Sequence, residues 1–435
     1  MKIISSYKIK ITHYNKIFND TVAIYRRAVA FFINICEAEW AALASLSNKR
    51  RNNHMEKLTL ATKKNPNPKY DFNADFYKMP AYLRRAAIQA AIGCYESYIS
   101  NLKNWENSDQ SKKKPTLTME RHVMPVLYRD NCYIRTGRNT AKIKVFHMND
   151  WVWLTVGLRE QDVKYIEKYC ANCKECVPTL SKSGKQWYLV FSFVKNETLS
   201  DKPVKDSVVC AVDLGINYNA VCSIMLSDGT VVARGFINLA AEKDRLCKAL
   251  GRLKKAQQQG NLKTPVKWKH VNDINRDISR KTAKAILEFA ILHAADVIVF
   301  EYLDMQGKKC GSKKQRLHLW RKQEIQRIVE HRAHKSGMRI SRICAWKTSM
   351  FAFDGSGKVK RNNDNYSQCE FTSGKKYQTD LNASYNIGAR YFIRELLKSE
   401  PAMARLPNEA KVLRYGTGTT RTLSTLIRLH ADICA

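Results

Sequence analysis

Three carboxylates in the second half of the chain stand where apolar runs end or a helical pattern begins. Asp213 closes a run of apolar residues that begins at Val208, and Glu301 closes a similar run from Val297. Asp380 opens the last clear helical pattern. An acid directly after several buried apolar residues is costly unless its charge is neutralised at an edge of the fold. A divalent cation supplies that neutralisation, and Mg²⁺ prefers hard oxygen ligands of this kind.

Two Mg²⁺ ions held by such a cluster can activate a water and stabilise the leaving oxygen during phosphodiester cleavage. Taken alone, each acid is more often a cap or a salt-bridge partner than a metal ligand. Their order along the chain is more specific: strand and Asp, hairpin, long helix, strand and Glu, helix, strand, polar insertion, Asp and helix. This order favours one shared metal site of Asp213, Glu301 and Asp380 over three separate caps or salt-bridge partners.

The elements around these acids have an α/β pattern that is compatible with an RNase H-like core. A hairpin is indicated by Ser227-Asp228-Gly229, which lies between two strand-like segments. Strands are expected at 208–214, 219–226, 230–237, 296–301 and 338–345, and helices at 239–258, 272–295, 317–336 and from residue 381.

The first half has a different pattern. A strand-like segment at 3–13 is followed by helical patterns at about 20–47 and 80–105, with a polar segment between them that we interpret as a loop at 48–76. Short segments rich in β-branched and aromatic residues then continue from 114 to 197. This order predicts a β-barrel that is interrupted by a helical domain.

The composition points to a nucleic-acid partner. The 435 residues carry 75 Lys and Arg against 39 Asp and Glu, a formal net charge of +36. A compact fold with such an excess repels itself unless a polyanion neutralises it, and nucleic-acid phosphates bind basic surfaces through counterion release. The 13 cysteines are odd in number and scattered, which favours reduced thiols in the cytosol over disulfides. The most apolar stretch contains Glu37 and Glu39, so we expect no membrane span.

Three segments resemble the split motifs of a RuvC-like nuclease: they read VDLGI at 212–216, VIVFEYL at 297–303 and DLNASYNI at 380–387. Their surroundings resemble TnpB, the transposon-encoded ancestor of type V CRISPR effectors, and its miniature CRISPR descendants. Trp320, GMRI at 337–340 and KTS at 347–349 add to this resemblance. It implies a RuvC-like nuclease domain at 207–345 and 379–435, a wedge-type β-barrel domain at 1–13 and 114–200, a helical recognition domain at 14–113, and a zinc-ribbon-like insertion at 346–378.

The family resemblance implies an RNA-guided DNA endonuclease in the cytoplasm of a prokaryote, acting as a monomer or homodimer. Asp213 and Asp380 would hold Mg²⁺, with Glu301 completing the site. A guide RNA would pair with the target DNA, while the protein would read a short adjacent motif. One protein sequence does not separate a transposon-encoded nuclease from a miniature CRISPR effector, so both origins stay open.

Two other functions are compatible with parts of this pattern. A nuclease-inactive, RNA-guided DNA-binding repressor would share the fold, although such relatives lose one or more of the acids that are all present here. An RNase H-fold transposase would also use an acidic triad, since one fold supports several chemistries. The large basic first half and the motifs weigh against the transposase.

The insertion at 346–378 departs from the family pattern. TnpB-like proteins carry four cysteines there in two CxxC pairs, the spacing of a closed zinc site. The corresponding positions in this chain are occupied by Ala352, Gly355, Glu370 and Ser373. With only Cys344 and Cys369 nearby, we expect no structural zinc and a short lid or loop near the nuclease cleft. The alternative is a disordered segment.

Three further groups of residues could bind ligands. Cys170, Cys173 and Cys176 have a metal-like spacing but lack a clear fourth ligand, so we interpret them as reduced loop cysteines. A basic run between Lys308 and Arg316 could contact phosphates or form a solvated loop. The last group lies in the tail at 395–435, where nucleic-acid contacts and a solvated helix are both open for Arg414, Arg421 and Arg428.

Overall fold

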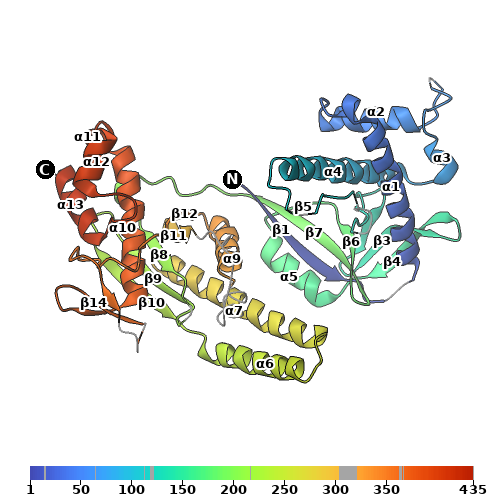
Figure 1. Cartoon of the computed structure of the whole chain (residues 1–435). Helices are drawn as coiled ribbons and strands as arrows, with labels where there is room; N and C mark the ends of the chain where they lie inside the picture. The colour runs from blue at the N-terminus through green and yellow to red at the C-terminus, as the bar shows by residue number, and fades with distance from the viewer. Residues whose placement is uncertain are drawn as a thin grey trace. The chain divides into compact units, whose positions relative to one another are not determined.

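The computed structural model of the protein describes all residues except 14–15, 64, 112, 118–121, 216, 303–320, 362–364, 366 and 435. The chain folds into two compact units, residues 2–195 and residues 196–435 with Met1. Figure 1 shows the helices and strands of both units. Among the helices that the structure describes, none combines the length and the apolarity needed to cross a membrane.

The helices of the first unit are built around a long pair. Their bounds are α1 (Ile17–Leu43), α2 (Asn48–Thr59), α3 (Phe72–Asp75), α4 (Ala81–Glu106) and α5 (Glu160–Cys170). α1 and α4 pack against each other, and the predicted apolar positions of α1 lie in the core of the unit. The helical patterns at 20–47 and 80–105 are therefore confirmed to within a few residues.

Helix α2 shows that the expected loop at 48–76 is wrong in its first part. Arg51 of α2 is 8% exposed and donates to the carbonyl oxygens of Leu43 and Ala44 at 2.8 Å each, where α1 ends. Its Nη1 also lies 2.5 Å from Oε1 of Glu96 on α4. These tertiary contacts stabilise a helix with few apolar residues, so the periodicity of its sequence does not reveal it.

The strands of the first unit form two sheets. One contains β1 (Lys2–Lys10), β5 (Lys174–Glu175), β6 (Thr179–Ser183) and β7 (Gln186–Asn196), and the other contains β2 (Tyr133–Gly137), β3 (Thr140–His147) and β4 (Asp150–Gly157). An isolated bridge between Ile11 and Leu158 links β1 and β4. A barrel requires a continuous ladder around its circumference. Within the described residues the hydrogen-bonded ladder is not continuous around the two sheets, and the chain after β4 forms helix α5 in place of a further strand. The closed barrel is therefore not confirmed.

The second unit is an α/β layer structure. Its main sheet has the order β10-β9-β8-β11-β12 and consists of β8 (Val209–Asp213), β9 (Ala220–Met225), β10 (Val231–Ile237), β11 (Val297–Tyr302) and β12 (Arg339–Cys344). β8, β11 and β12 are parallel, whereas β8, β9 and β10 form an antiparallel meander. The meander followed by parallel strands agrees with the predicted RNase H-like core.

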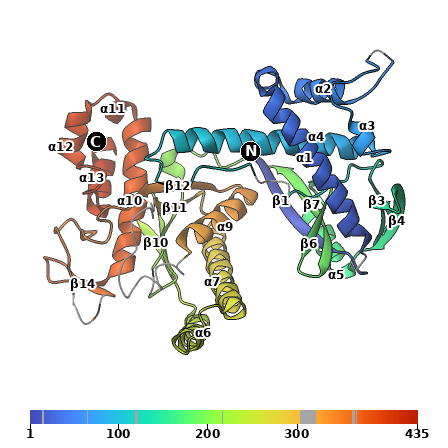
Figure 2. The same cartoon turned by 45° about the vertical axis from the view of Figure 1, so that its right-hand side comes forward.

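Helices cover both faces of this sheet. They are α6 (Ala240–Gln258), α7 (Pro265–Leu292), α9 (Lys322–Lys335), α10 (Thr379–Ser399), α11 (Pro401–Ala404), α12 (Asn408–Tyr415) and α13 (Leu423–Cys434). The face with Cys210, Val212 and Phe300 packs against residues of α7 and α9. The face with Val209 and Val299 packs against residues of α10 and α13. Both views show α10 alongside the sheet (Figures 1 and 2).

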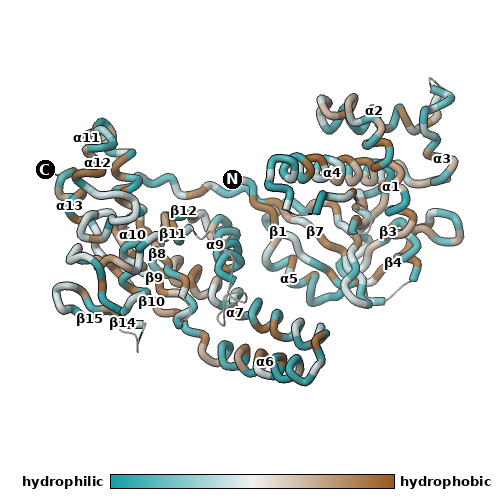
Figure 3. Tube along the Cα trace, in the orientation of Figure 1, coloured by the Kyte–Doolittle hydropathy of each residue, from teal (hydrophilic) through white to brown (hydrophobic). Residues whose placement is uncertain are grey.

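Close contact between α10 and the sheet depends on Gly388. A Cβ at this position would lie 3.0 Å from Sδ of Met225 and 3.2 Å from Cβ of Ala211. α6 packs against the first half of α7 through a separate apolar cluster, while the second half of α7 covers the sheet. Both helices carry hydrophobic and hydrophilic segments along their length (Figure 3), as expected of amphipathic helices.

The insertion at 346–378 forms a small sheet of β13 (Lys360–Arg361), β14 (Gln368–Glu370) and β15 (Lys376–Gln378). A compact apolar cluster lies beneath it and contains Ala352, Cys369 and Phe371, with Phe353 and Tyr377 packed against them. The ring centroid of Phe353 lies 5.4 Å from that of Phe371 and 5.0 Å from that of Tyr377. Aromatic packing thus holds the described part of the insertion together.

The tail after α10 belongs to the core of the second unit. Leu426 and Leu429 of α13 are buried against α10, as is Tyr415. The tail arginines make contacts within the tail: Arg414 pairs with Asp432 at 3.0 Å, and Arg428 donates to the carbonyl of Arg414. One face of α13 is thus apolar and covered, whereas Arg414 and Arg428 are exposed, so nucleic-acid contact and a solvated surface both stay open for them.

Candidate nuclease centre

Asp213 and Glu301 lie in one row of the main sheet. Val212 of β8 pairs with Phe300 of the parallel strand β11. Asp213 directly follows Val212, and Glu301 directly follows Phe300. Side chains alternate between the faces of a sheet, so both acids are on the same face as Ala211 and Val299, the face that α10 covers. Parallel neighbours are about 4.8 Å apart, so the two acids are adjacent at the carboxyl ends of their strands.

Asp380 reaches the same edge from helix α10. It lies in the first turn of this helix, where the side chain of Gln378 accepts a hydrogen bond from the backbone of Leu381. An ideal Cβ on Gly215 would lie 3.1 Å from Oδ2 of Asp380. The Asp380 carboxylate is therefore beside the chain two residues after Asp213, and the structure places all three predicted acids at one end of the sheet.

The electrostatics of the site show that Glu301 and Asp380 both act on Asp213. Burial raises the pKa of Asp213 well above its ordinary value, and the carboxylates of Glu301 and Asp380 raise it further. Burial also raises the pKa of Asp380. The hydrogen bond from Gln378 and the positive charge of Lys322 act to lower this pKa but do not outweigh burial. Ionised carboxylates so arranged repel one another in the absence of a cation, which is the situation that a divalent ion relieves.

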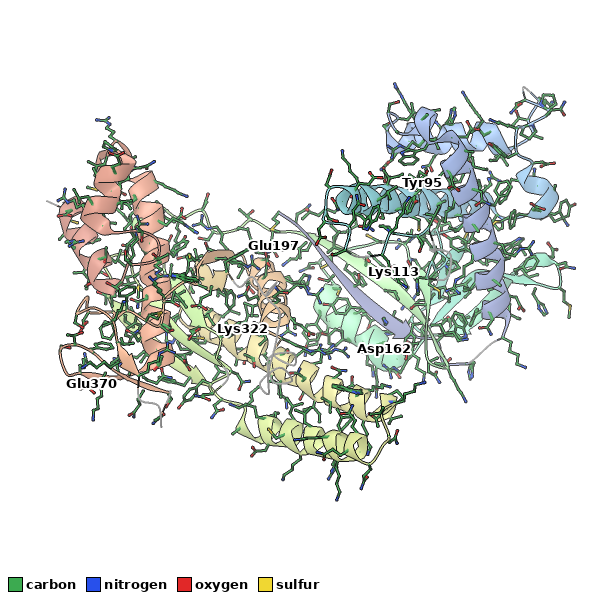
Figure 4. All side chains as sticks on the ribbon, viewed as in Figure 1. Tyr95, Lys113, Asp162, Glu197, Lys322 and Glu370 are labelled. Carbon is green, nitrogen blue, oxygen red and sulfur yellow. The ribbon has the colours of Figure 1, made fainter. Side chains whose placement is uncertain are left out.

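Lys322 is a member of this group that the sequence analysis missed. It is the first residue of α9, is 8% exposed and is labelled in Figure 4. Burial lowers the pKa of Lys322, whereas Asp213, Glu301 and Asp380 act to raise it. Its ammonium group thus offsets part of the negative charge at the site. No pattern distinguishes this lysine among the 75 basic residues of the chain.

The carboxylates do not form a ready-made metal cage. Across the described residues, no three His, Cys, Asp or Glu side chains come together closely enough to hold a metal ion by themselves. The donor set nevertheless fits Mg²⁺, which takes oxygen ligands, keeps several waters and is usually bound by one or two carboxylates plus substrate phosphate. Mg²⁺ sites of this general kind take their remaining oxygen ligands from water and from substrate phosphate.

Gly215 is expected to be essential for this geometry. Besides its closeness to Asp380, a Cβ on Gly215 would lie only 2.9 Å from the carbonyl oxygen of Tyr218. Gly215→Ala should displace the Asp380 carboxylate and lower the rate of DNA cleavage by roughly 100-fold, since shifts of about 1 Å can have that effect. Gly251→Ala in α6 is the matched control, because nothing lies within 4 Å of its added Cβ. Equal cleavage rates for the two variants would show that Asp380 does not need this close approach.

Of the other groups that the sequence analysis considered as possible ligands, those within the described residues are not part of the cluster of Asp213, Glu301 and Asp380. Cys369 is buried in the insertion cluster, where its thiol donates to the carbonyl of Tyr377 at 3.4 Å, and Cys344 is exposed. Cys170 is a core residue of the first unit, while Cys173 and Cys176 are half-buried. The basic run between Lys308 and Arg316 lies outside the described residues, as does Trp320.

Comparisons with known proteins give one family model and two related proteins. The Aq_aa04 family model matches residues 5–147. An uncharacterised protein of Aquifex aeolicus (strain VF5), aq_aa04, is 27% identical over 148 residues, which are 30% of this chain and 83% of that protein. The TnpB-like protein aq_aa05 of the same organism is 27% identical over 193 residues, 39% of this chain and 61% of its own length.

A solved structure extends the similarity to the whole fold. The mini-RNA-guided endonuclease CRISPR-Cas_phi3 matches with a TM-score of 0.53 at 10% identity, covering 89% of this chain and 92% of that one. At this identity the likeness shows a shared fold. Together with the TnpB-like relative, it confirms the resemblance to TnpB-like proteins and miniature type V effectors that the three motifs indicated.

Proposed function

We propose that this protein is an RNA-guided, Mg²⁺-dependent DNA endonuclease with a single RuvC-like nuclease centre. The observation that carries the proposal is the meeting of Asp213, Glu301 and Asp380 at the carboxyl edge of the sheet, from three segments far apart in sequence. A purely structural role is unfavourable for Asp213, because burial and the neighbouring carboxylates of Glu301 and Asp380 all oppose its ionisation. A nuclease centre accounts for all three.

In this proposal the three carboxylates would hold two Mg²⁺ ions, which would supply positive charge for phosphodiester cleavage. When bound, the ions lower the pKa of a water and stabilise the charge of the leaving oxygen. Asp213 and Asp380 hold the ions and Glu301 completes the site. Lys322 keeps a positive charge beside the carboxylates, which lowers the cost of assembling them before the substrate arrives.

The partners in this proposal are a guide RNA and double-stranded target DNA that is unwound into an RNA–DNA heteroduplex. The net charge of +36 is sufficient for two polyanions. The similar Cas_phi3 protein is described as an RNA-guided endonuclease, which favours this assignment over a transposase. The insertion at 346–378 would contact the target near the nuclease centre, since β15 ends two residues before Asp380.

The test uses protein purified together with the RNA that is expressed from its native locus. Plasmid carrying sequences complementary to that RNA should be cut in Mg²⁺, and EDTA or prior digestion of the RNA should abolish cutting. Cleavage that survives RNA digestion would favour the transposase. Binding of the target without any cleavage in Mg²⁺ or Mn²⁺ would favour the repressor.

A further inference from the structure

Glu301 has a partner from the insertion. The hydroxyl of Thr348 donates to Oε1 of Glu301 at 2.5 Å, across 47 residues of sequence. Both side chains are buried, with Thr348 only 3% exposed. The same hydroxyl is 3.2 Å from the carbonyl of Ala345, but it has one proton, and the shorter contact to a carboxylate is the stronger one. The orientation of the Glu301 carboxylate is therefore set by Thr348.

Thr348 is itself held by helix α10. Nδ2 of Asn386 donates to the carbonyl oxygens of Thr348 and Phe351, each at 2.9 Å. One turn earlier, Asn382 donates to the same Phe351 carbonyl at 2.9 Å and accepts from the backbone N–H of Phe353 at 2.8 Å. Asn382 and Asn386 are fully buried and lie four residues apart, on one face of the helix. The first residues of the insertion are thus fastened to the helix that carries Asp380.

We infer that Thr348 is a positioning residue of the nuclease centre, and that Asn386 orients it so that the insertion and Glu301 are mechanically linked. Helix α10 then positions two of the three acids: it carries Asp380 directly, and it fixes Glu301 through Asn386 and Thr348. A glutamate has three rotatable side-chain bonds, so a buried donor that selects one orientation decides where its second oxygen points. This inference rests on the proposed function and assigns to the insertion a contribution to metal binding.

The experiment measures Mn²⁺ affinity by electron paramagnetic resonance on the intact protein, so it has a readout besides cleavage. Thr348→Val and Thr348→Ala remove the hydroxyl, and Thr348→Ser keeps it. Loss of a residue that orients a metal ligand typically lowers metal affinity roughly 10- to 100-fold, so we expect this loss for the first two variants. The serine variant should stay within about 3-fold of the wild type, and the cleavage rates should follow the same order.

The control is Thr59→Val in the first unit. Thr59 is also fully buried and donates one hydrogen bond, to the carbonyl of Met55 at 2.7 Å. Its loss should leave Mn²⁺ affinity unchanged. If Thr348→Val does not fold, the alanine and serine variants give the same comparison.

Wild-type affinity in the folded alanine or valine variant would overturn the role of Thr348 while leaving the proposed function intact. Absence of Mn²⁺ binding and of cleavage in the wild-type protein would overturn both.

Discussion

Asp213→Asn should reduce cleavage of guide-matched DNA by at least about 1000-fold while the metal-free protein becomes more stable. A bound metal ion contributes several kcal/mol of charge stabilisation in the transition state, and each 1.4 kcal/mol or so is a factor of ten in rate. Asparagine keeps the shape of the side chain but removes its charge. The measurements are plasmid cleavage in Mg²⁺ and the melting temperature in EDTA.

The gain in stability follows from the raised pKa of Asp213. In the folded state this carboxyl keeps its proton at pH values where the unfolded chain has lost it. The contribution of Asp213 to the stability of the metal-free wild type is therefore most favourable at low pH and falls as the pH rises from the ordinary carboxyl range through the raised pKa. The asparagine side chain of the variant does not titrate, so the difference in melting temperature between variant and wild type should grow over that range.

Asp296, which directly precedes β11, the strand of Glu301, provides a control. Its substitution is expected to change the stability in the opposite direction. Burial acts to raise the pKa of Asp296, but hydrogen bonds from the backbone of Val208 and the side chains of Lys202 and Ser200 outweigh it and lower the pKa. Asp296→Asn should therefore lower the melting temperature at neutral pH. A stabilised Asp296 variant, or an Asp213 variant that cuts at the wild-type rate, would contradict the assignment of the two roles.

Arg390→Met should cause the largest loss of stability among single substitutions in α10. The guanidinium of Arg390 is 3% exposed and donates to the carbonyl oxygens of Cys344, Trp346, Thr419 and Arg421, at 2.8–3.2 Å. Methionine fills similar space but removes the donor from these four carbonyl oxygens, at about 1–3 kcal/mol for each one that water cannot reach. Because such losses are not additive, we expect the free energy of unfolding of the second unit to fall by about 3–6 kcal/mol.

Arg394→Met, one turn further along α10, is the matched comparison. Arg394 makes three hydrogen bonds, to Glu395, the carbonyl of Arg342 and Ser341, against four for Arg390, and 35% of its side chain is exposed. Water can replace these bonds, so a loss of about 1 kcal/mol is expected. Chemical denaturation of both variants provides the measurement. An equal loss for the two would show that burial of the Arg390 network adds nothing to stability.

The sequence predicted the elements whose stability is local or periodic. The buried strands that end at Asp213 and Glu301 and the long helices were found because their apolar residues follow the period of the element. α2 and the three short strands of the insertion were missed. The buried residues of α2 contact α1 and α4, and strands of two or three residues carry no periodic signal.

The candidate site could be predicted from the sequence only in part, because only some of its residues have a local signal. The three acids could be found because each occupies a marked position in a strand or helix. Lys322 and Thr348 could not, because their role depends on contacts across the fold and not on neighbours in sequence. Thr348 lies in the KTS segment that carried part of the family resemblance, and that was its one signal.

Under the proposed function, the spacing of the acids also determines when during synthesis the nuclease centre can be complete. Residues 2–195 form one contiguous unit and can fold as soon as they leave the ribosome, since domains generally fold in order from the N-terminus. The cutting centre requires strands at residues 213 and 301 and a helix that extends to Ser399. A nascent chain therefore presents a folded first unit while it is still harmless to DNA, and translation products that stop before Asp380 stay harmless.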